Sequence, residues 1–105
     1  MKYDINNKLE NIKKSGLFTI DQIGVIEYAI YIPGINIDLI LNPTIPSEYM
    51  SMYIRLMLKG IDVTKYIKRN WELIEIPVVD LEKTILSENK NVIDKPKQKV
   101  IRRNI

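Results

Sequence analysis

The sequence predicts an α+β domain, in which a three-stranded antiparallel sheet is packed by about four helices. Two stretches carry this prediction. Residues 25–41, "VIEYAIYIPGINIDLIL", alternate apolar side chains on both sides of Pro33-Gly34, as a β-hairpin does. Residues 71–76, "WELIEI", are typical of a third strand, which Pro77 would end because proline cannot donate to a sheet ladder.

The hairpin register places only apolar pairs on one face, so we expect that face to form a wall of the core. These pairs are Ile32 with Ile35, Ile30 with Ile37, Tyr28 with Leu39, and Ile26 with Leu41. A competing interpretation begins at Thr19, because "TIDQ" has the spacing of a helix capping box. The density of β-branched residues after Gly24 favours the strand, so we expect only a helical turn near residues 19–23.

Apolar spacing and chain breakers predict the helices. Residues 3–14 form the first, with Ile5, Leu9 and Ile12 on one stripe and Gly16 after its end. After Pro43 and Pro46, Ser47 can cap a helix that runs to Lys59 and stops at Gly60.

Two shorter helices follow, capped by Asp62 and by Asp80. From Asn91 onward the chain becomes polar and basic, so we divide it into one domain at residues 1–91 and a flexible tail at 92–105. No internal repeat is evident in the sequence alone.

Composition limits the possible chemistry. The chain has 105 residues, 46% of them hydrophobic, which suits one globular domain. It contains no Cys and no His, so thiolate chemistry is excluded and the commonest general base and metal ligand is missing. We therefore expect no cofactor and no metal. No apolar run approaches the ~20 residues of a membrane span, and no signal peptide is evident, so we expect a cytoplasmic protein.

Motifs for catalysis are weak. "SENK", residues 87–90, has the spacing of a serine–lysine pair, but such a short motif is common by chance. Asp80 and Glu82 could offer oxygen ligands to Mg²⁺, although their place at a helix start is explained by capping and the helix dipole. We expect no enzymatic activity.

Nucleic-acid binding is the alternative function. Three basic residues lie on the predicted short helix, beside Tyr66 and Trp71 as stacking surfaces, and four lie in the tail. They are Lys65, Lys68, Arg69, Lys97, Lys99, Arg102 and Arg103. The competing explanation is that these charges only solvate an outer helix face.

Protein binding is the leading hypothesis. The helix at 47–59 is apolar except for one polar stripe, and a sheet can cover only one of its flanks. We therefore expect four of its side chains, Tyr49, Met52, Tyr53 and Leu56, to form an exposed contact surface for a partner protein or a second copy. The alternative is that the first helix covers this flank. The general character fits a phage or mobile-element product, such as an inhibitor or an assembly component.

Overall fold

Helices build the part of the chain that the structure describes. The computed structural model describes residues 2–90, and this range contains no strand, so the predicted α+β class is wrong. The elements are α1 (Lys2–Ser15), α2 (Ile20–Ala29), the 3₁₀ helix η1 (Ile37–Ile40), α3 (Ser47–Leu58), α4 (Thr64–Lys68), α5 (Asn70–Leu73) and α6 (Val78–Glu88).

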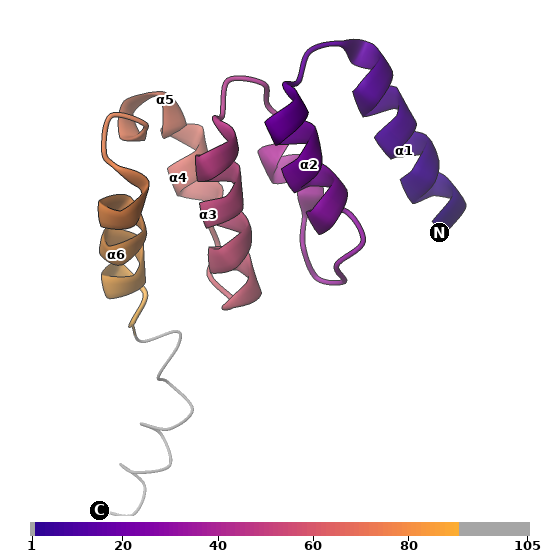
Figure 1. The fold of residues 1–105 in the computed structure, drawn as a ribbon. Helices are drawn as coiled ribbons and strands as arrows, with labels where there is room; N and C mark the ends of the chain where they lie inside the picture. Colours follow the sequence, from indigo (N-terminus) through magenta and orange to yellow (C-terminus); the bar gives the residue numbers. More distant parts are fainter. Residues whose placement is uncertain (1, 91–105) are drawn as a thin grey trace, which may run out of the picture.

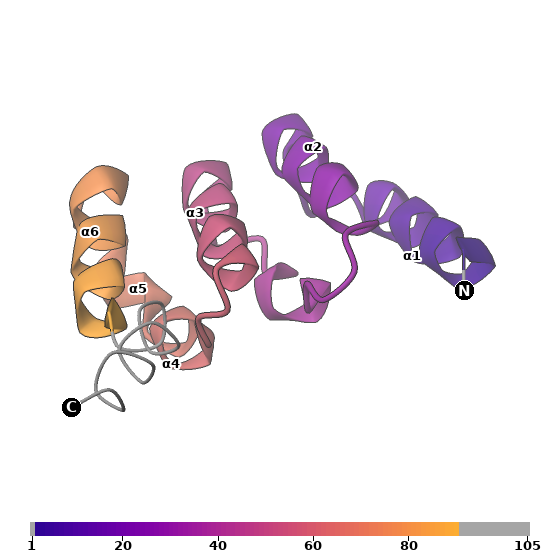
Figure 2. The same ribbon diagram turned by 90° about the horizontal axis from the view of Figure 1, so that it is seen from below.

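The four longer helices stand side by side in one row, in the order α1, α2, α3, α6 (Figures 1 and 2). Within this row α1 packs on α2, α2 on α3, and α3 on α6. The short helices lie along one side of the row, where α4 contacts both η1 and α5 (Figure 2). The fold is thus two unequal layers, one of long helices and one of short helices.

The predicted hairpin at 25–41 is wrong, because its first half belongs to α2 and its second half contains η1. A capping box decides the outcome: the Thr19 hydroxyl accepts a hydrogen bond from the Gln22 amide (3.1 Å), and the Gln22 side chain accepts one from the Thr19 amide (2.8 Å). The buried residues of α2 are Gln22, Ile26 and Ala29, spaced four and three apart as on one helix face.

The alternating pattern was misleading because α2 and the turn after it are apolar on more than one side. Ile26 and Ile30 are buried and Val25 is half-buried, while Tyr28 is 66% exposed. Pro33-Gly34 lies in the loop between α2 and η1, where Gly34 has a φ of +88°. When a segment is apolar on several sides, its apolar residues fit both the two-residue period of a strand and the 3.6-residue period of a helix. The apolar pattern alone therefore does not distinguish a strand from a helix.

The predicted strand at 71–76 is also wrong, because Asn70–Leu73 forms α5 and a turn follows it. The carbonyl groups of Ile74 and Ile76 accept hydrogen bonds from the hydroxyl of Tyr49 on α3, at 2.9 and 2.6 Å. A buried side chain therefore satisfies the acceptors that a sheet ladder would have used. Pro77, expected to end a strand, is the N-cap of α6.

The other predicted helices are present, with corrections at their starts. α1 and α3 match the predicted ranges closely, and Gly16 follows α1 with a φ of +71°. Pro46, not Ser47, is the N-cap of α3, and α6 begins at Val78 with Asp80 in its first turn. The tail predicted at 92–105 lies outside the described residues.

An internal repeat becomes visible once the helices are placed. Residues 34–41, "GINIDLIL", correspond to residues 60–67, "GIDVTKYI", and each segment leads into a short helix after a long one. Gly34 and Gly60 have φ values of +88° and +85°. The side chain of Asn36 accepts a hydrogen bond from the Asp38 amide (3.2 Å), and that of Asp62 accepts one from the Thr64 amide (3.0 Å).

The long helices of the two units also correspond. Gln22, Ile26 and Ala29, the buried residues of α2, have the same spacing as Tyr49, Tyr53 and Leu56, which are three of the six buried residues of α3. The offset between the helices is 27 residues, one more than that between the two glycines. The chain therefore contains two successive units of long helix, loop and short helix. Such units bury their apolar faces by stacking on their neighbours, which accounts for the open row.

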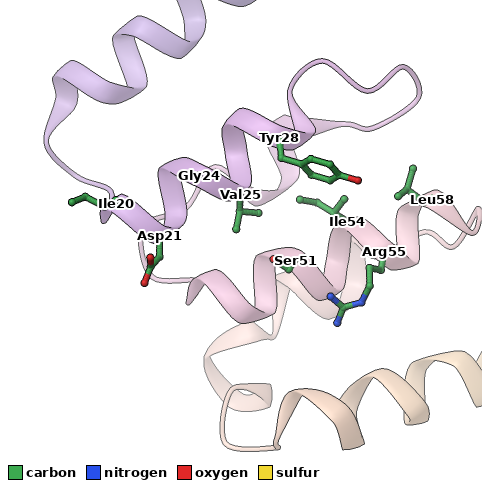
Figure 3. Close-up of a pocket in the computed structure, with 9 residues that line it drawn as sticks. All are labelled: Ile20, Asp21, Gly24, Val25, Tyr28, Ser51, Ile54, Arg55 and Leu58. Atoms are coloured by element: carbon green, nitrogen blue, oxygen red, sulfur yellow. The ribbon is translucent and has the colours of Figure 1, made fainter.

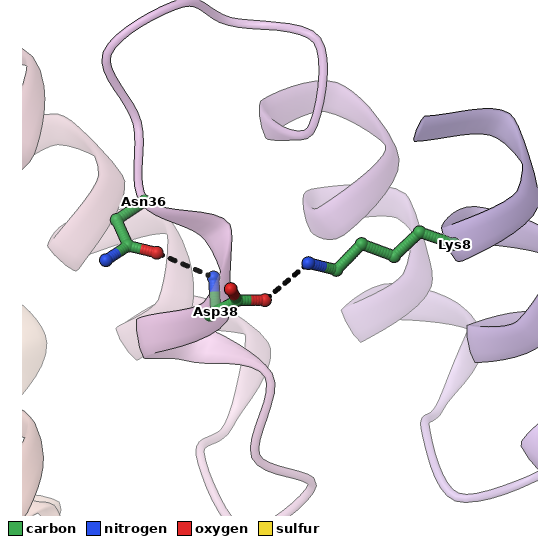
Figure 4. Close-up of polar contacts among 3 residues, drawn as sticks. All are labelled: Lys8, Asn36 and Asp38. Carbon is green, nitrogen blue, oxygen red and sulfur yellow. Dashed lines mark hydrogen bonds and ion pairs between the residues drawn. The ribbon is translucent and has the colours of Figure 1, made fainter. Parts of the chain in front are cut away.

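Ion pairs tie the ends of the row to its middle. Lys8 of α1 donates to the Asp38 carboxylate of η1, whose own amide is held by Asn36 (Figure 4). At the other end, Arg55 of α3 pairs with Glu82 of α6 through two hydrogen bonds of 2.7 and 3.1 Å. These pairs add to the packing that joins α1 and α6 to the middle of the row.

Candidate protein-binding groove

The contact surface predicted on α3 does not exist as an exposed surface. Its four residues, Tyr49, Met52, Tyr53 and Leu56, have exposed fractions of 6%, 0%, 0% and 0%. The reason is the position of α3 in the middle of the row, where α2 and α6 flank it and the short helices lie on a third side. The Tyr53 hydroxyl is used inside the chain, where it donates to the side-chain oxygen of Asn70 (3.0 Å).

Of the seven basic residues that the sequence suggested for nucleic-acid binding, three lie in the described part of the chain. Lys65, Lys68 and Arg69 are exposed on α4 and at its C-cap. Arg69 pairs with Glu72 (2.8 Å), and the Lys65 ammonium lies 5.2 Å from the centre of the Tyr66 ring. The other four, Lys97, Lys99, Arg102 and Arg103, lie outside the described residues.

A groove with a volume of about 670 Å³ runs between α2 and α3, lined by residues from both helices (Figure 3). Its lining residues are Ile20, Asp21, Gly24, Val25 and Tyr28 of α2 together with Ser51, Ile54, Arg55 and Leu58 of α3. The buried positions of α2 are different residues of the helix, so the groove occupies another face of the same helix pair.

The groove gathers exposed apolar side chains. Ile20, Tyr28 and Leu58 are 88%, 66% and 53% exposed, and all three lie along it. Val25 and Ile54 are directed toward the space between the helices (Figure 3). Single exposed apolar residues are ordinary on a protein surface, but a group of them along one groove marks an interaction site.

Gly24 keeps the middle of the groove open. It is an exposed residue inside α2, and a Cβ atom placed on it would meet no atom within 4 Å. Glycine in a helix interior costs roughly 0.5–1 kcal/mol relative to alanine. The missing side chain therefore lowers helix stability and leaves space for a ligand between Ile20 and Tyr28.

The polar groups at the groove are few. Arg55 is directed away from α2 (Figure 3), and its bidentate pair with Glu82 lowers the pKa of that carboxyl, chiefly through the hydrogen bond. Asp21 and Ser51 are the other polar side chains. The groove therefore offers mainly apolar surface, with the carboxylate of Asp21 at one end, which has no ion-pair partner within residues 2–90.

One of the polar side chains at the groove is not available as a general base. Arg55 stays protonated and is held by Glu82. Over residues 2–90, no three acidic side chains gather in a group that could hold a metal ion. No helix in the same range has the length and apolar character needed to cross a membrane.

The sequence contains a pattern that predicts the groove, but this pattern can be recognised only after the residues are assigned to a helix. Ile20, Gly24 and Tyr28 are four residues apart and therefore share one face of a helix. Two large apolar residues with a glycine between them on one helix face predict an open apolar surface there. Only Tyr28 of these three residues lies within the predicted hairpin at 25–41, so the strand interpretation did not group them.

No protein-family model matches the chain, and comparison with curated proteins and with solved structures finds no significant match.

Proposed function

We propose that this chain is a non-enzymatic protein-binding module that holds a partner in the groove between α2 and α3. The observation that carries the proposal is the gathering of Ile20, Tyr28 and Leu58, all more than half exposed, along a groove of about 670 Å³. Burying these side chains against a partner is the free-energy source for binding. An inhibitor or an assembly component can act by binding alone, and a surface of this kind is sufficient for that.

The repeated architecture supports the proposal. Stacked helical units create extended surfaces between neighbouring helices, and proteins built this way use such surfaces for binding. The groove lies between α2 and α3, which are the long helices of the two units. These two units also have the corresponding segments 34–41 and 60–67. The core on the opposite side of the units fixes the spacing of α2 and α3, so the groove is preformed.

Nucleic-acid binding through α4 is the less favoured alternative. Lys65 and Lys68 are exposed there, but Asp62 lines the same hollow, and Glu72 already pairs with Arg69. A surface of mixed charge neutralises few phosphates, which predicts weak binding that falls gently with salt. Affinity for short DNA or RNA across a salt series tests this alternative. Tight binding with a steep slope would favour it, whereas weak binding with a shallow slope would leave protein binding as the function.

The experiment for the groove is a selection from a random peptide display library on the immobilised full-length chain. Gly24→Arg places a long, charged side chain in the middle of the groove, at a position where nothing lies within 4 Å of the added Cβ. Gly24→Ala is the matched control, which changes the same residue but leaves most of the space. We expect sequences that enrich on the wild type and on Gly24→Ala but not on Gly24→Arg. Enrichment that is equal on all three proteins would remove the groove as the binding site.

A further inference from the structure

We propose that the occupant of the groove is a short amphipathic helix of the partner protein, lying antiparallel to α2 and α3. This inference rests on the proposed function and names the chemistry of the partner. It follows from the backbone groups at the groove, from the length of the apolar rim, and from the directions of α2 and α3 together with the charge of Asp21.

The walls of the groove favour a helix over an extended peptide. Both walls are sides of α-helices, whose backbone N–H and C=O groups already bond within α2 and α3. An extended peptide needs a sheet edge or a row of polar side chains to satisfy its own backbone, and the lining offers only Asp21, Ser51 and Arg55 as polar side chains. A helix brings its backbone hydrogen bonds with it and presents only side chains.

The length of the groove sets the size of the occupant. From Ile20 to Tyr28 the apolar rim runs for a little over two helical turns, about 12 Å. A helix of two to three turns covers this distance and places apolar residues at i, i+4 and i+7 along it. A stable dimer of this chain would need about 800 Å² from each copy, which a rim of this length does not supply.

The charges define the direction of the helix. Figure 3 shows that α2 and α3 run the same way, with Asp21 near the start of α2 and Leu58 beside Tyr28 at the other end. Lys59 follows Leu58 as an exposed C-cap of α3. An antiparallel helix aligns its dipole favourably against both neighbours. Its basic last turn would meet Asp21, and an acidic first turn at the Leu58 end complements its own dipole, which is the charge order that helices prefer. Lys59 itself faces Glu82 of α6, whose pKa it lowers.

The other face of the same helix pair is already covered by a short apolar helix. Ile37 and Ile40 of η1 are buried in one cluster with Ile26 of α2 and Tyr53 of α3. Figure 2 places η1 on the side of the row where the short helices lie. The chain therefore shows, within itself, the kind of element that packs against α2 and α3 together.

The test uses two matched display libraries of 14-residue peptides on the full-length chain. In the first, positions 3, 7 and 10 sample Leu, Ile, Val, Met and Phe on a helix-forming background with an acidic first turn and a basic last turn. The second is identical except for a proline at position 8, which breaks the helix. The random library used for the groove itself serves as the third arm.

We expect binders from the first library that are at least tenfold depleted in the second and lost on Gly24→Arg. Asp21→Lys should weaken the same binders by about two- to fivefold, the range of an exposed ion pair. Groove-dependent binders that come only from the random library, or that tolerate the proline, would overturn the helical occupant while leaving the binding function intact. The absence of groove-dependent binders from all three libraries would overturn both.

Discussion

Gln22 joins three segments of the chain through one buried side chain. Its amide oxygen completes the capping box with Thr19, and its amide nitrogen donates to the carbonyl oxygens of Pro43 (3.0 Å) and Ile45 (2.7 Å). The start of α2 is thereby tied to the loop that precedes α3. A polar residue at this buried position is stable because all of its hydrogen-bonding groups are used.

Replacing Gln22 with alanine should lower the free energy of unfolding by about 2–3 kcal/mol, because one half of the capping box is lost and the carbonyl groups of Pro43 and Ile45 lose their donor. Urea denaturation followed by far-UV circular dichroism measures the change. The control Asp21→Asn, at the exposed neighbouring position, should stay within about 0.5 kcal/mol of the wild type. A loss below 0.5 kcal/mol for Gln22→Ala would show that the side chain does not hold the loop.

Tyr53 makes the stability of the core sensitive to alkaline pH. Burial, and to a smaller extent the nearby Tyr49, raises the pKa of Tyr53 to about 12 from the ordinary value of 10.0. The folded state therefore favours the neutral phenol. This contribution to stability is complete below pH 10 and is lost as the pH rises toward 12.

The matched variant Tyr53→Phe isolates this effect, because all other groups titrate alike in both proteins. At pH 8 the wild type should be more stable by about 1 kcal/mol, through the hydrogen bond to Asn70. Between pH 10 and 12 the wild type should lose this advantage, as measured by urea denaturation at a series of pH values. Parallel pH profiles for the two proteins would mean that Tyr53 is not desolvated in the folded state.

At the scale of single elements, two glycines with opposite roles give a matched pair of substitutions. Gly24→Ala should raise the free energy of unfolding by about 0.5–1 kcal/mol, since Gly24 lies inside α2 with open space around it. Gly60→Ala should lower it by about 1 kcal/mol or more, because Gly60 has a φ of +85°. Thermal unfolding of both variants measures the difference, and a loss of stability in Gly24→Ala would contradict the helical assignment of residue 24.

Sequence reasoning located the helices whose ends are marked by strong breakers. α1 ends before Gly16, and α3 lies between the prolines at 43 and 46 and Gly60, so local chemistry defines both. It failed where packing decides the outcome. Residues 25–29 and 71–73 are apolar on several sides and carry strand-favouring residues, so their helical state depends on the capping box at Thr19 and on the contacts of Tyr49.

The sequence predicted the kind of candidate site but not its location. A surface for a partner protein was expected, but on the face of α3 that α2, α6 and the short helices bury. Of the seven large apolar residues that are exposed in the described part of the chain, Ile20, Tyr28 and Leu58 lie on the face shared by α2 and α3. They could not be grouped while residues 25–29 were assigned to a strand. The internal repeat could not be predicted for the same reason, since α2 was assigned to a strand and therefore did not correspond to α3.

The whole molecule is an open row in which each long helix depends on its neighbours. α3 is flanked on both sides, whereas α1 packs on α2 alone within the row and has Leu9 and Ile12 as its buried residues among those described. In stacked helical units the stability of each unit is set by its own packing and by its nearest neighbours. The two ends of the row therefore differ from its centre in local stability.

Native-state hydrogen exchange should follow this gradient, with the slowest amides in α3 and faster exchange in α1. Protection in α1 should fall further in Lys8→Ala, which removes the ion pair to Asp38, while protection in α3 stays close to that of the wild type. Mass spectrometry of proteolytic fragments resolves the helices separately. Equal protection in α1 and α3 would indicate one cooperative core in place of a row of units.

The most direct measurement of partner binding in the groove is a ¹H–¹⁵N spectrum of the chain labelled only at glycine. The four glycines give one signal each, and of these Gly24 lines the groove, while Gly34 and Gly60 line a different hollow beside η1 and α4. Titration with a peptide selected on the wild type should shift the Gly24 signal and leave those of Gly34 and Gly60 in place. A peptide that binds while shifting Gly34 or Gly60, with Gly24 unchanged, would contradict the assignment of the groove as the binding site.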